Sequence, residues 1–321
     1  MRFVRTLIVA MAALLTHAAC AEDRPLTVGY SDWPGWVAWE IALEKGWFDE
    51  AGVSVEFEWF DYAASMEAFS AGSLDAVCMT NGDTLVTGAT GRRGQMILIN
   101  DFSNGNDMIV GRPGIKEVSE LEDKAVGVEV GFVSHLLLLR ALESVGLSEE
   151  DLELVNVRTN ETPMVLASGE VDAIVAWQPN SSQSLEMVPG SVSIYSSSND
   201  PGLIYDVLAV APESLAQRAE DWQKVVDVWY RVVGFLSDPE TLPEGLEIMA
   251  ARVGIEPEVY ETFFSGTQFL TKEEAKKRYE KSDGLDSLWG SSQIADDFNV
   301  KYRVYSQAQD ISAYIDSSFY Q

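Results

Sequence analysis

Ala71-Gly72-Ser73-Leu74-Asp75-Ala76-Val77 returns later in the chain as Ser168-Gly169-Glu170-Val171-Asp172-Ala173-Ile174. In both copies a small residue and a glycine precede a short apolar run that carries one aspartate. A glycine in this setting ends a helix, and the apolar run after it is typical of a buried strand. The repeat therefore predicts two halves built on one plan.

The segments upstream of the two copies also correspond. Val28-Gly29-Tyr30-Ser31 matches Val126-Gly127-Val128-Glu129, and a second apolar run follows each, at 53–57 and at 152–157. Each half is thus predicted to run strand, helix, strand, helix, strand. This alternation favours an α/β fold in which each lobe is a mostly parallel sheet flanked by helices, with right-handed crossovers.

The chain is expected to cross between the lobes twice, which makes a two-strand hinge. Strands at 96–101 and 107–110 leave the first lobe and enter the second, and residues 203–210 return. Apolar residues at helical spacing between Trp222 and Phe235 predict a core helix in the last third. The expected domains are a signal peptide (1–21), a first lobe with C-terminal helices (22–103 plus 207–321) and a second lobe (104–206).

The first residues indicate export. A basic start (Met1–Arg5), an apolar run too short to span a bilayer (Leu7–Leu15) and small residues around Ala21 predict a signal peptide and a periplasmic location. Cys20 offers the alternative of a lipid anchor, but His17 stands where a lipidation motif normally has Leu. We therefore expect cleavage after Ala21.

The charge balance is strongly acidic. The formal net charge of −29 would become −31 on loss of Arg2 and Arg5, which argues against nucleic acid and anionic membranes as partners. Cys78 would then be the remaining cysteine, within an apolar strand, and His135 the remaining histidine. No disulfide, metal site, catalytic triad or cofactor is expected.

Ligands of open α/β sheets bind beyond the carboxyl ends of the strands. The loops at those positions are rich in carboxylates, amides, hydroxyls and aromatic rings, and the loops considered contain no Lys or Arg. Asp32 and Asp83 could instead cap helices, and Ser134 is expected to be a helix N-cap with His135 in the first turn. The expected ligand-binding residues are Ser31, Asp32, Trp33, Trp36, Thr80, Asn81, Asp83, Asn100, Asp101, Glu129, Ser134, Trp177, Gln178, Tyr205 and Asp206.

Several motifs resemble a known family. Residues 29–36 (Gly-Tyr-Ser-Asp-Trp-Pro-Gly-Trp), 44–48 (Glu-Lys-Gly-Trp-Phe), 69–76 (Phe-Ser-Ala-Gly-Ser-Leu-Asp-Ala) and 176–179 (Ala-Trp-Gln-Pro) resemble the nitrate/sulfonate/taurine-type substrate-binding proteins of ABC transporters, the SsuA/THI5-like group. The similarity is greatest to the urea-carboxylase-associated branch. It implies a type II periplasmic-binding-protein fold, a "Venus flytrap", that delivers its ligand to a permease and an ATPase.

Carboxylates beside Trp and Tyr faces suit a cation or a donor-rich nitrogen compound. We therefore expect a monomeric, non-enzymatic protein that captures a small cationic or neutral nitrogenous solute, guanidine- or urea-like. The alternatives are a sulfonate, taurine or aromatic-acid ligand, a sensor domain, and a pyrimidine-precursor synthase. The synthase of this superfamily uses pyridoxal phosphate and a cysteine-rich motif, which the single remaining cysteine and the absence of a strand-end Lys disfavour.

Overall fold

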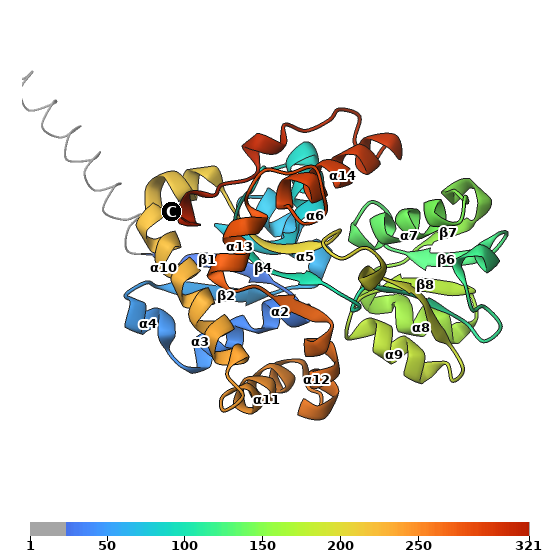
Figure 1. Cartoon of the computed structure of the whole chain (residues 1–321), viewed down its shortest axis with the longest axis horizontal. Coiled ribbons are helices and arrows are strands. Elements are labelled where there is room, and N and C mark those ends of the chain that lie inside the picture. The colour runs from blue at the N-terminus through green and yellow to red at the C-terminus, as the bar shows by residue number, and fades with distance from the viewer. Residues whose placement is uncertain (1–23, 321) are drawn as a thin grey trace, which may run out of the picture.

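Two sheets, one in each lobe, form the framework of the computed structural model, which describes residues 24–320 (Figure 1). The expected signal peptide lies outside the described residues. Strand order is β11-β4-β10-β3-β1-β2 in the first sheet and β7-β6-β8-β5-β9 in the second. The strands are β1 (Leu26–Tyr30), β2 (Val55–Trp59), β3 (Ala76–Thr80), β4 (Gln95–Ser103), β5 (Met108–Gly111), β6 (Ala125–Val128), β7 (Glu153–Asn156), β8 (Ala173–Ala176), β9 (Val192–Ser196), β10 (Tyr205–Val210) and β11 (Thr267–Phe269).

The two sheets share one topology. The run β4-β10-β3-β1-β2 corresponds to β9-β5-β8-β6-β7. In each, three parallel strands stand beside one antiparallel strand, β10 or β5, that arrives from the other lobe. β4 and β9 pair antiparallel with that arriving strand and so run with the parallel set. The mostly parallel α/β plan predicted from the internal repeat is confirmed.

Hydrogen bonds explain why the repeated sequence has its aspartate. The Asp75 carboxylate accepts from the backbone N–H of Thr27 at 3.0 Å, and the Asp172 carboxylate accepts from that of Ala125 at 3.1 Å. Each aspartate therefore ties the start of the third strand of its lobe to the first. The glycines before them, Gly72 and Gly169, have φ of 81° and 85°, which L-residues adopt at a cost.

Helices cover both faces of the sheets. Those of the second lobe are α7 (Val133–Ser144), α8 (Thr162–Ser168) and α9 (Asn180–Met187). Those of the first lobe are α2 (Pro34–Val37), α3 (Trp39–Glu44), α4 (Trp47–Ala51), α5 (Tyr62–Ser70), α6 (Asn81–Thr90), α10 (Pro212–Ser237), α11 (Leu242–Val253), α12 (Pro257–Ser265), α13 (Lys272–Arg278) and α14 (Leu288–Lys301).

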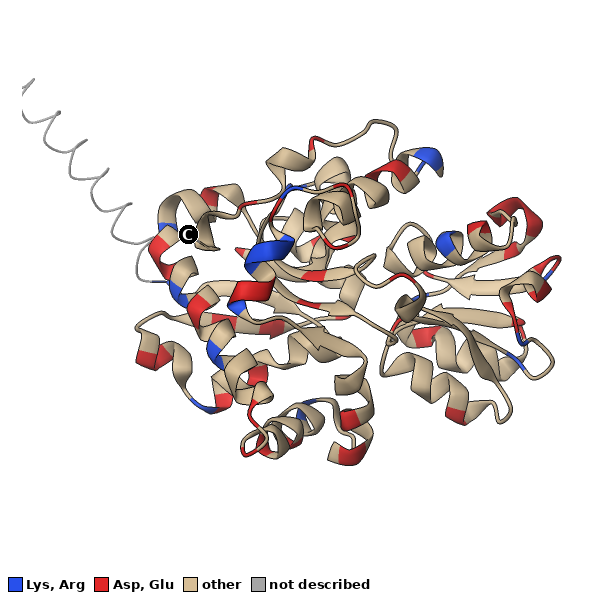
Figure 2. Ribbon diagram, viewed as in Figure 1, with Lys and Arg blue, Asp and Glu red and all other residues tan. Residues whose placement is uncertain are grey.

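The predicted core residues are buried. Cys78 in β3 is fully buried, as are Trp222 and Trp229 on α10. The two indoles belong to the helical stripe expected between Trp222 and Phe235, and Trp229 packs on Trp39 with ring centroids 4.5 Å apart. Acidic side chains are spread over both lobes (Figure 2). Among residues 24–320, no helix has both the length and the apolar character needed to cross a membrane.

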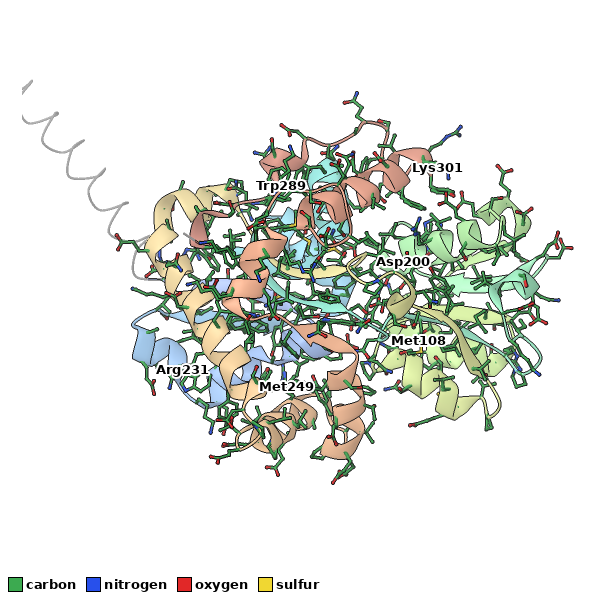
Figure 3. All side chains as sticks on the ribbon, viewed as in Figure 1. Met108, Asp200, Arg231, Met249, Trp289 and Lys301 are labelled. Carbon is green, nitrogen blue, oxygen red and sulfur yellow. The ribbon has the colours of Figure 1, made fainter. Side chains whose placement is uncertain are left out.

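The hinge consists of the two connections β4–β5 and β9–β10. The Ser103 and Ser197 hydroxyls are hydrogen-bonded at 2.7 Å, and the Ser197 N–H donates to the Asp107 carbonyl at 2.9 Å. We propose lobe boundaries close to the expected ones, 22–103 with 207–321 and 104–206, because the chain passes between the sheets at these two connections; Tyr205 and Asp206 already pair with β3 and β4 in the first sheet. Apart from the hinge, α14 also spans the lobes: Lys301 at its end pairs with Glu143 of α7 (Figure 3).

Candidate functional site

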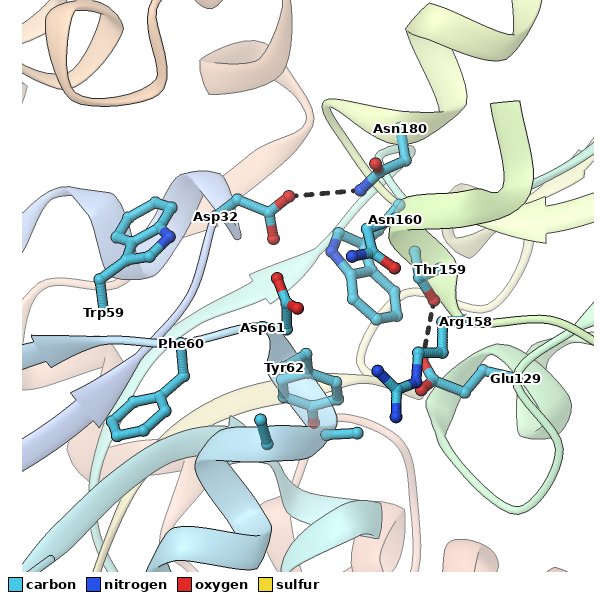
Figure 4. A pocket seen from close by; sticks show the side chains of 13 residues that line it. Asp32, Trp59, Phe60, Asp61, Tyr62, Glu129, Arg158, Thr159, Asn160 and Asn180 are labelled. Carbon is cyan, nitrogen blue, oxygen red and sulfur yellow. Dashed lines mark hydrogen bonds between the residues drawn. The ribbon is translucent and has the colours of Figure 1, made fainter. Parts of the chain in front are cut away.

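An outer pocket opens between the lobes, where strand ends of both sheets face each other (Figure 4). It encloses about 520 Å³ of empty space, part of it open to solvent. Its first-lobe side follows β1 and β2, and its second-lobe side follows β6, β7 and β8. The lining residues are Asp32, Trp59, Phe60, Asp61, Tyr62, Ala63, Ala64, Glu129, Arg158, Thr159, Asn160, Trp177 and Asn180.

Polar contacts hold the rim of the outer pocket. The Asn180 side-chain amide donates to the Asp32 carboxylate across the cleft at 3.3 Å. Burial raises the pKa of Asp32, and the charge of Asp61 acts in the same direction. On the second lobe, the Thr159 hydroxyl donates to the Glu129 carboxylate at 3.1 Å, while burial raises the pKa of Glu129.

A smaller inner chamber shares Tyr62 and Trp177 with this pocket, and its empty space of about 210 Å³ includes space open to solvent. Aromatic rings and carboxylates make up most of its wall. Within the described residues, neither cavity is lined by Lys or His. The lining residues are Trp33, Trp36, Tyr62, Thr80, Asp107, Val133, Trp177, Ile204 and Asp206.

Four carboxyl groups gather at and behind the chamber. Asp101 and Asp206 are partners on the neighbouring strands β4 and β10, and Asp107 follows in the hinge. Burial raises the pKa of Asp101 to about 8 and that of Asp107 to about 7. Burial, followed by the charges of Asp101 and Asp107, raises the pKa of Asp206 well above its usual range. The charge of Asp83 adds to this shift, so ionisation of Asp206 is opposed by the other three carboxyl groups.

The carboxyls differ in their protein partners. Asp101 accepts from the Trp33 indole N–H at 3.1 Å, which turns it toward α2. Asp83 accepts from the Tyr62 hydroxyl at 2.6 Å and from the Val133 N–H at 3.3 Å. One oxygen each of Asp101, Asp107 and Asp206 (Oδ2) is buried and has no hydrogen-bond donor within residues 24–320. Of these three residues, Asp107 and Asp206 line the chamber.

Other buried polar atoms around the chamber share this property. The Trp36 indole nitrogen, which could donate, lines the chamber and has no acceptor in the described part of the chain. Native proteins satisfy most buried polar atoms, so such a group of atoms points to a polar ligand. Side-chain atoms of Ser31, Asn100 and Ser134 are likewise buried without a described protein partner.

The predicted site residues fall into three groups. Asp32, Glu129 and Trp177 line the outer pocket, and Trp33, Trp36, Thr80, Trp177 and Asp206 line the inner chamber. Ser31, Asp83, Asn100, Asp101 and Ser134 are buried without lining either cavity. Asn81, Gln178 and Tyr205 form the third group, and their side chains bond to other parts of the protein.

The side chains of the third group form hydrogen bonds within the protein. Asn81 donates to Ser291 of α14 at 2.9 Å and accepts from the Tyr205 N–H at 3.1 Å. The Tyr205 hydroxyl donates to the Leu285 carbonyl at 2.9 Å. Gln178 accepts from the Ser182 N–H in α9 at 3.3 Å. For these side chains the geometry favours a role in holding helices rather than a ligand.

Two expectations are wrong. Arg158 lines the outer pocket, so the cleft does contain a basic residue; it follows β7, a strand whose end loop the sequence argument passed over. Ser134 is not the N-cap of α7, because that helix begins at Val133 and its N-cap position is Phe132. His135 does lie in the first turn, where its ring accepts from the Gly131 N–H at 3.3 Å.

Several lining residues are not among the expected ligand-binding residues. Asp61 and Asn180 lie in the loops after β2 and β8, to which the strand-end rule points. Tyr62 is the first residue of α5 and lines both cavities. Asp107 lies in the hinge, which a strand-end rule does not address. Among residues 24–320 no group of three or more His, Cys, Asp or Glu is placed to hold a metal ion.

The fold and its interlobe cleft define a class: the α/β protein of two lobes known as the type II periplasmic-binding-protein fold. The predicted fold class is thereby confirmed. The chain belongs to the NMT1-like family, whose model matches residues 19–250.

Similar proteins of known sequence or structure agree with this class. A putative binding protein of Brucella abortus is 28% identical over 92% of each chain. The alkanesulfonate-binding protein SsuA of Xanthomonas axonopodis pv. citri, bound to MOPS, has a TM-score of 0.75 at 17% identity over 92% of this chain and 99% of that one. The ligand-binding component of an ABC-type import system of Staphylococcus aureus, with zinc bound, has a TM-score of 0.76 at 13% identity over 93% and 98%.

Proposed function

We propose that this protein is the exported, solute-binding component of an ABC importer and that it captures a small nitrogen-rich cation of the guanidinium type. The importer role rests on the family, on the two-lobed cleft and on the import proteins that share the fold. A permease and an ATPase would then be the partners, and the periplasm the compartment. The signal-like sequence before Ala21 supports export.

One observation carries the ligand class. Asp107 and Asp206 line a buried aromatic chamber, and each has a carboxyl oxygen without a donor in the described chain. A guanidinium ion brings N–H donors in one plane together with a positive charge, which fits both the carboxylates and the ring faces. Neutral urea has the donors without the charge and is the next candidate in this class.

A sulfonate is the alternative, since a similar protein of known structure is named as an alkanesulfonate-binding protein. Arg158 would be the basic residue available to it, and it lines the outer pocket rather than the chamber. Inside the chamber a sulfonate would face Asp107 and Asp206, which repel it unless they are protonated. The enzyme alternative, a pyrimidine-precursor synthase, needs a reactive Lys or His, and the residues that line the two cavities include neither.

Isothermal titration calorimetry tests the ligand class. The purified protein without residues 1–21 is titrated at pH 8 with guanidinium chloride, urea, methylammonium, taurine and methanesulfonate, each at concentrations far below denaturing ones. We expect guanidinium to bind most tightly. Binding of a sulfonate or taurine with none of a cation would contradict the proposal. An Asp206→Asn variant keeps the shape of the site but cannot become a carboxylate, and it should weaken guanidinium binding more than urea binding.

A further inference from the structure

We propose that Tyr62 and Trp177 form a gate between the two cavities that limits the size of the ligand. The inference rests on the proposed binding function, because it concerns what the inner chamber accepts. Both residues line both cavities. They come from opposite lobes, Tyr62 from the start of α5 and Trp177 from the loop after β8. Their position makes them the partition between the chamber and the open pocket.

The two rings meet across the cleft. Their centroids are 5.2 Å apart and their planes lie at 79°, an edge-to-face contact. Tyr62 is 5% exposed and Trp177 4%. With the lobes in this arrangement the rings fill the space between the two cavities. A ligand substituent that passed from the chamber into the outer pocket would have to separate them.

Tyr62 is held so that it cannot easily move aside. Its hydroxyl donates to Asp83 at 2.6 Å and accepts from the Thr80 N–H at 3.1 Å. Its ring stacks on Trp36 with centroids 5.5 Å apart. Turning the ring away would break two hydrogen bonds that are buried, and the energy of buried hydrogen bonds to a charged group is substantial. The gate therefore yields by separation of the lobes rather than by rotation of this side chain.

Other contacts make that separation unfavourable. The Asn180–Asp32 and Val133–Asp83 hydrogen bonds also bridge the lobes, on the outer and inner side of the gate. A ligand that props the rings apart would weaken both. Full closure is thus reserved for a small solute that stays on the chamber side of the two rings, such as an unsubstituted or singly methylated guanidinium.

A homologous series tests the gate. Guanidinium, methyl-, ethyl-, propyl- and butylguanidinium are titrated by calorimetry, and methane-, ethane- and butanesulfonate are run in parallel. We expect the affinity of the wild-type protein to fall at least tenfold from guanidinium to propylguanidinium. Trp177→Ala should weaken guanidinium itself yet bring the whole series within about threefold, because the passage is then open. Trp177→Leu, which keeps apolar packing, is the second variant should the alanine variant unfold.

Trp59→Ala is the matched control. Trp59 lines the outer pocket but not the chamber and is 38% exposed, so its removal should leave the slope of the series unchanged. A flat series in the wild-type protein, or an equal loss for every ligand in both Trp177 variants, would overturn the gate. A steep series among sulfonates with no binding of guanidinium compounds would support the gate while overturning the proposed ligand.

Discussion

The Asp83 carboxylate of the first lobe accepts a hydrogen bond from the backbone N–H of Val133 in the second, with 3.3 Å between Oδ2 and N. Val133 is the first residue of α7, so the carboxylate meets the positive end of a helix dipole. The same oxygen accepts from the Tyr62 hydroxyl at 2.6 Å. Asp83 therefore links the gate to the contact between the lobes, which is a different role from direct ligand contact.

Replacement of Asp83 tests this role. Asp83→Ala removes both hydrogen bonds, of which the one from Val133 joins the lobes, and one bond to a charged group contributes about 1.5–3 kcal/mol. We expect ligand affinity to fall roughly ten- to a hundredfold, since about 1.4 kcal/mol corresponds to tenfold. Small-angle scattering should report a larger radius of gyration at saturating guanidinium. Tyr62→Phe loses both bonds of the hydroxyl but keeps the ring and the Val133–Asp83 bond between the lobes, so its effect on affinity should be smaller. Wild-type affinity in Asp83→Ala would show that closure does not depend on this carboxylate.

Affinity for guanidinium should rise with pH. Burial holds the pKa of Asp107 at about 7 and that of Asp101 at about 8, so these groups are protonated in acid and lose their charge. A guanidinium ion stays charged throughout, as the arginine side chain does. Between pH 6 and 8.5 the dissociation constant should fall, approaching tenfold per pH unit where one proton is released on binding. Urea is neutral, and its affinity should be nearly independent of pH. If the dissociation constants of guanidinium and urea changed equally with pH, the proposal of a cationic ligand would be contradicted.

Stability without ligand should change in the opposite direction. A raised pKa means that the native protein binds more protons than the unfolded chain, in which Asp titrates near about 3.9. The free energy of unfolding should therefore fall as pH rises from about 4 to about 8. Urea unfolding at several pH values measures this free energy.

Asp107→Asn should lessen the fall in the free energy of unfolding, because burial raises the pKa of Asp107 to about 7. Asp49→Asn, on an exposed position of α4, should leave the profile unchanged. A profile that rises over this range would be inconsistent with neutral buried carboxyls.

Trp33 contributes to stability both through a hydrogen bond and through the packing of its ring, and two variants distinguish these contributions. It lines the chamber and its indole N–H donates to Asp101 at 3.1 Å. Trp33→Phe keeps an apolar ring and loses this donor, which should cost about 1–3 kcal/mol of stability. The Trp33 side chain is only 3% exposed. Trp33→Ala therefore also leaves a cavity, and it should lower the free energy of unfolding by about 3–5 kcal/mol. Chemical unfolding of both variants gives the comparison. Wild-type stability in Trp33→Phe would mean that the hydrogen bond to Asp101 contributes nothing.

The alternation of strands and helices, the repeat and the topology of the two lobes could be predicted from the sequence. These depend on local signals: glycines at 72 and 169 that take positive φ, apolar runs of strand length, and a helical stripe around Trp222 and Trp229. Seven of the fifteen predicted site residues line one of the two cavities, because carboxyl ends of neighbouring parallel strands meet at one edge. The loop after β7 obeys the same rule and would have revealed Arg158.

The tertiary structure alone decided which partners each of the buried carboxyl groups has. Asp83, Asp101 and Asp206 are equivalent in the sequence as acidic residues near strand ends. Contacts between segments distant in the chain separate them: Asp83 bonds to α7 and Tyr62, and one oxygen of Asp101 bonds to Trp33. Asp206 lines the chamber and has an oxygen that no donor in the described chain reaches. Such contacts depend on how one lobe sits against the other, and no periodicity of a single chain segment encodes that relation.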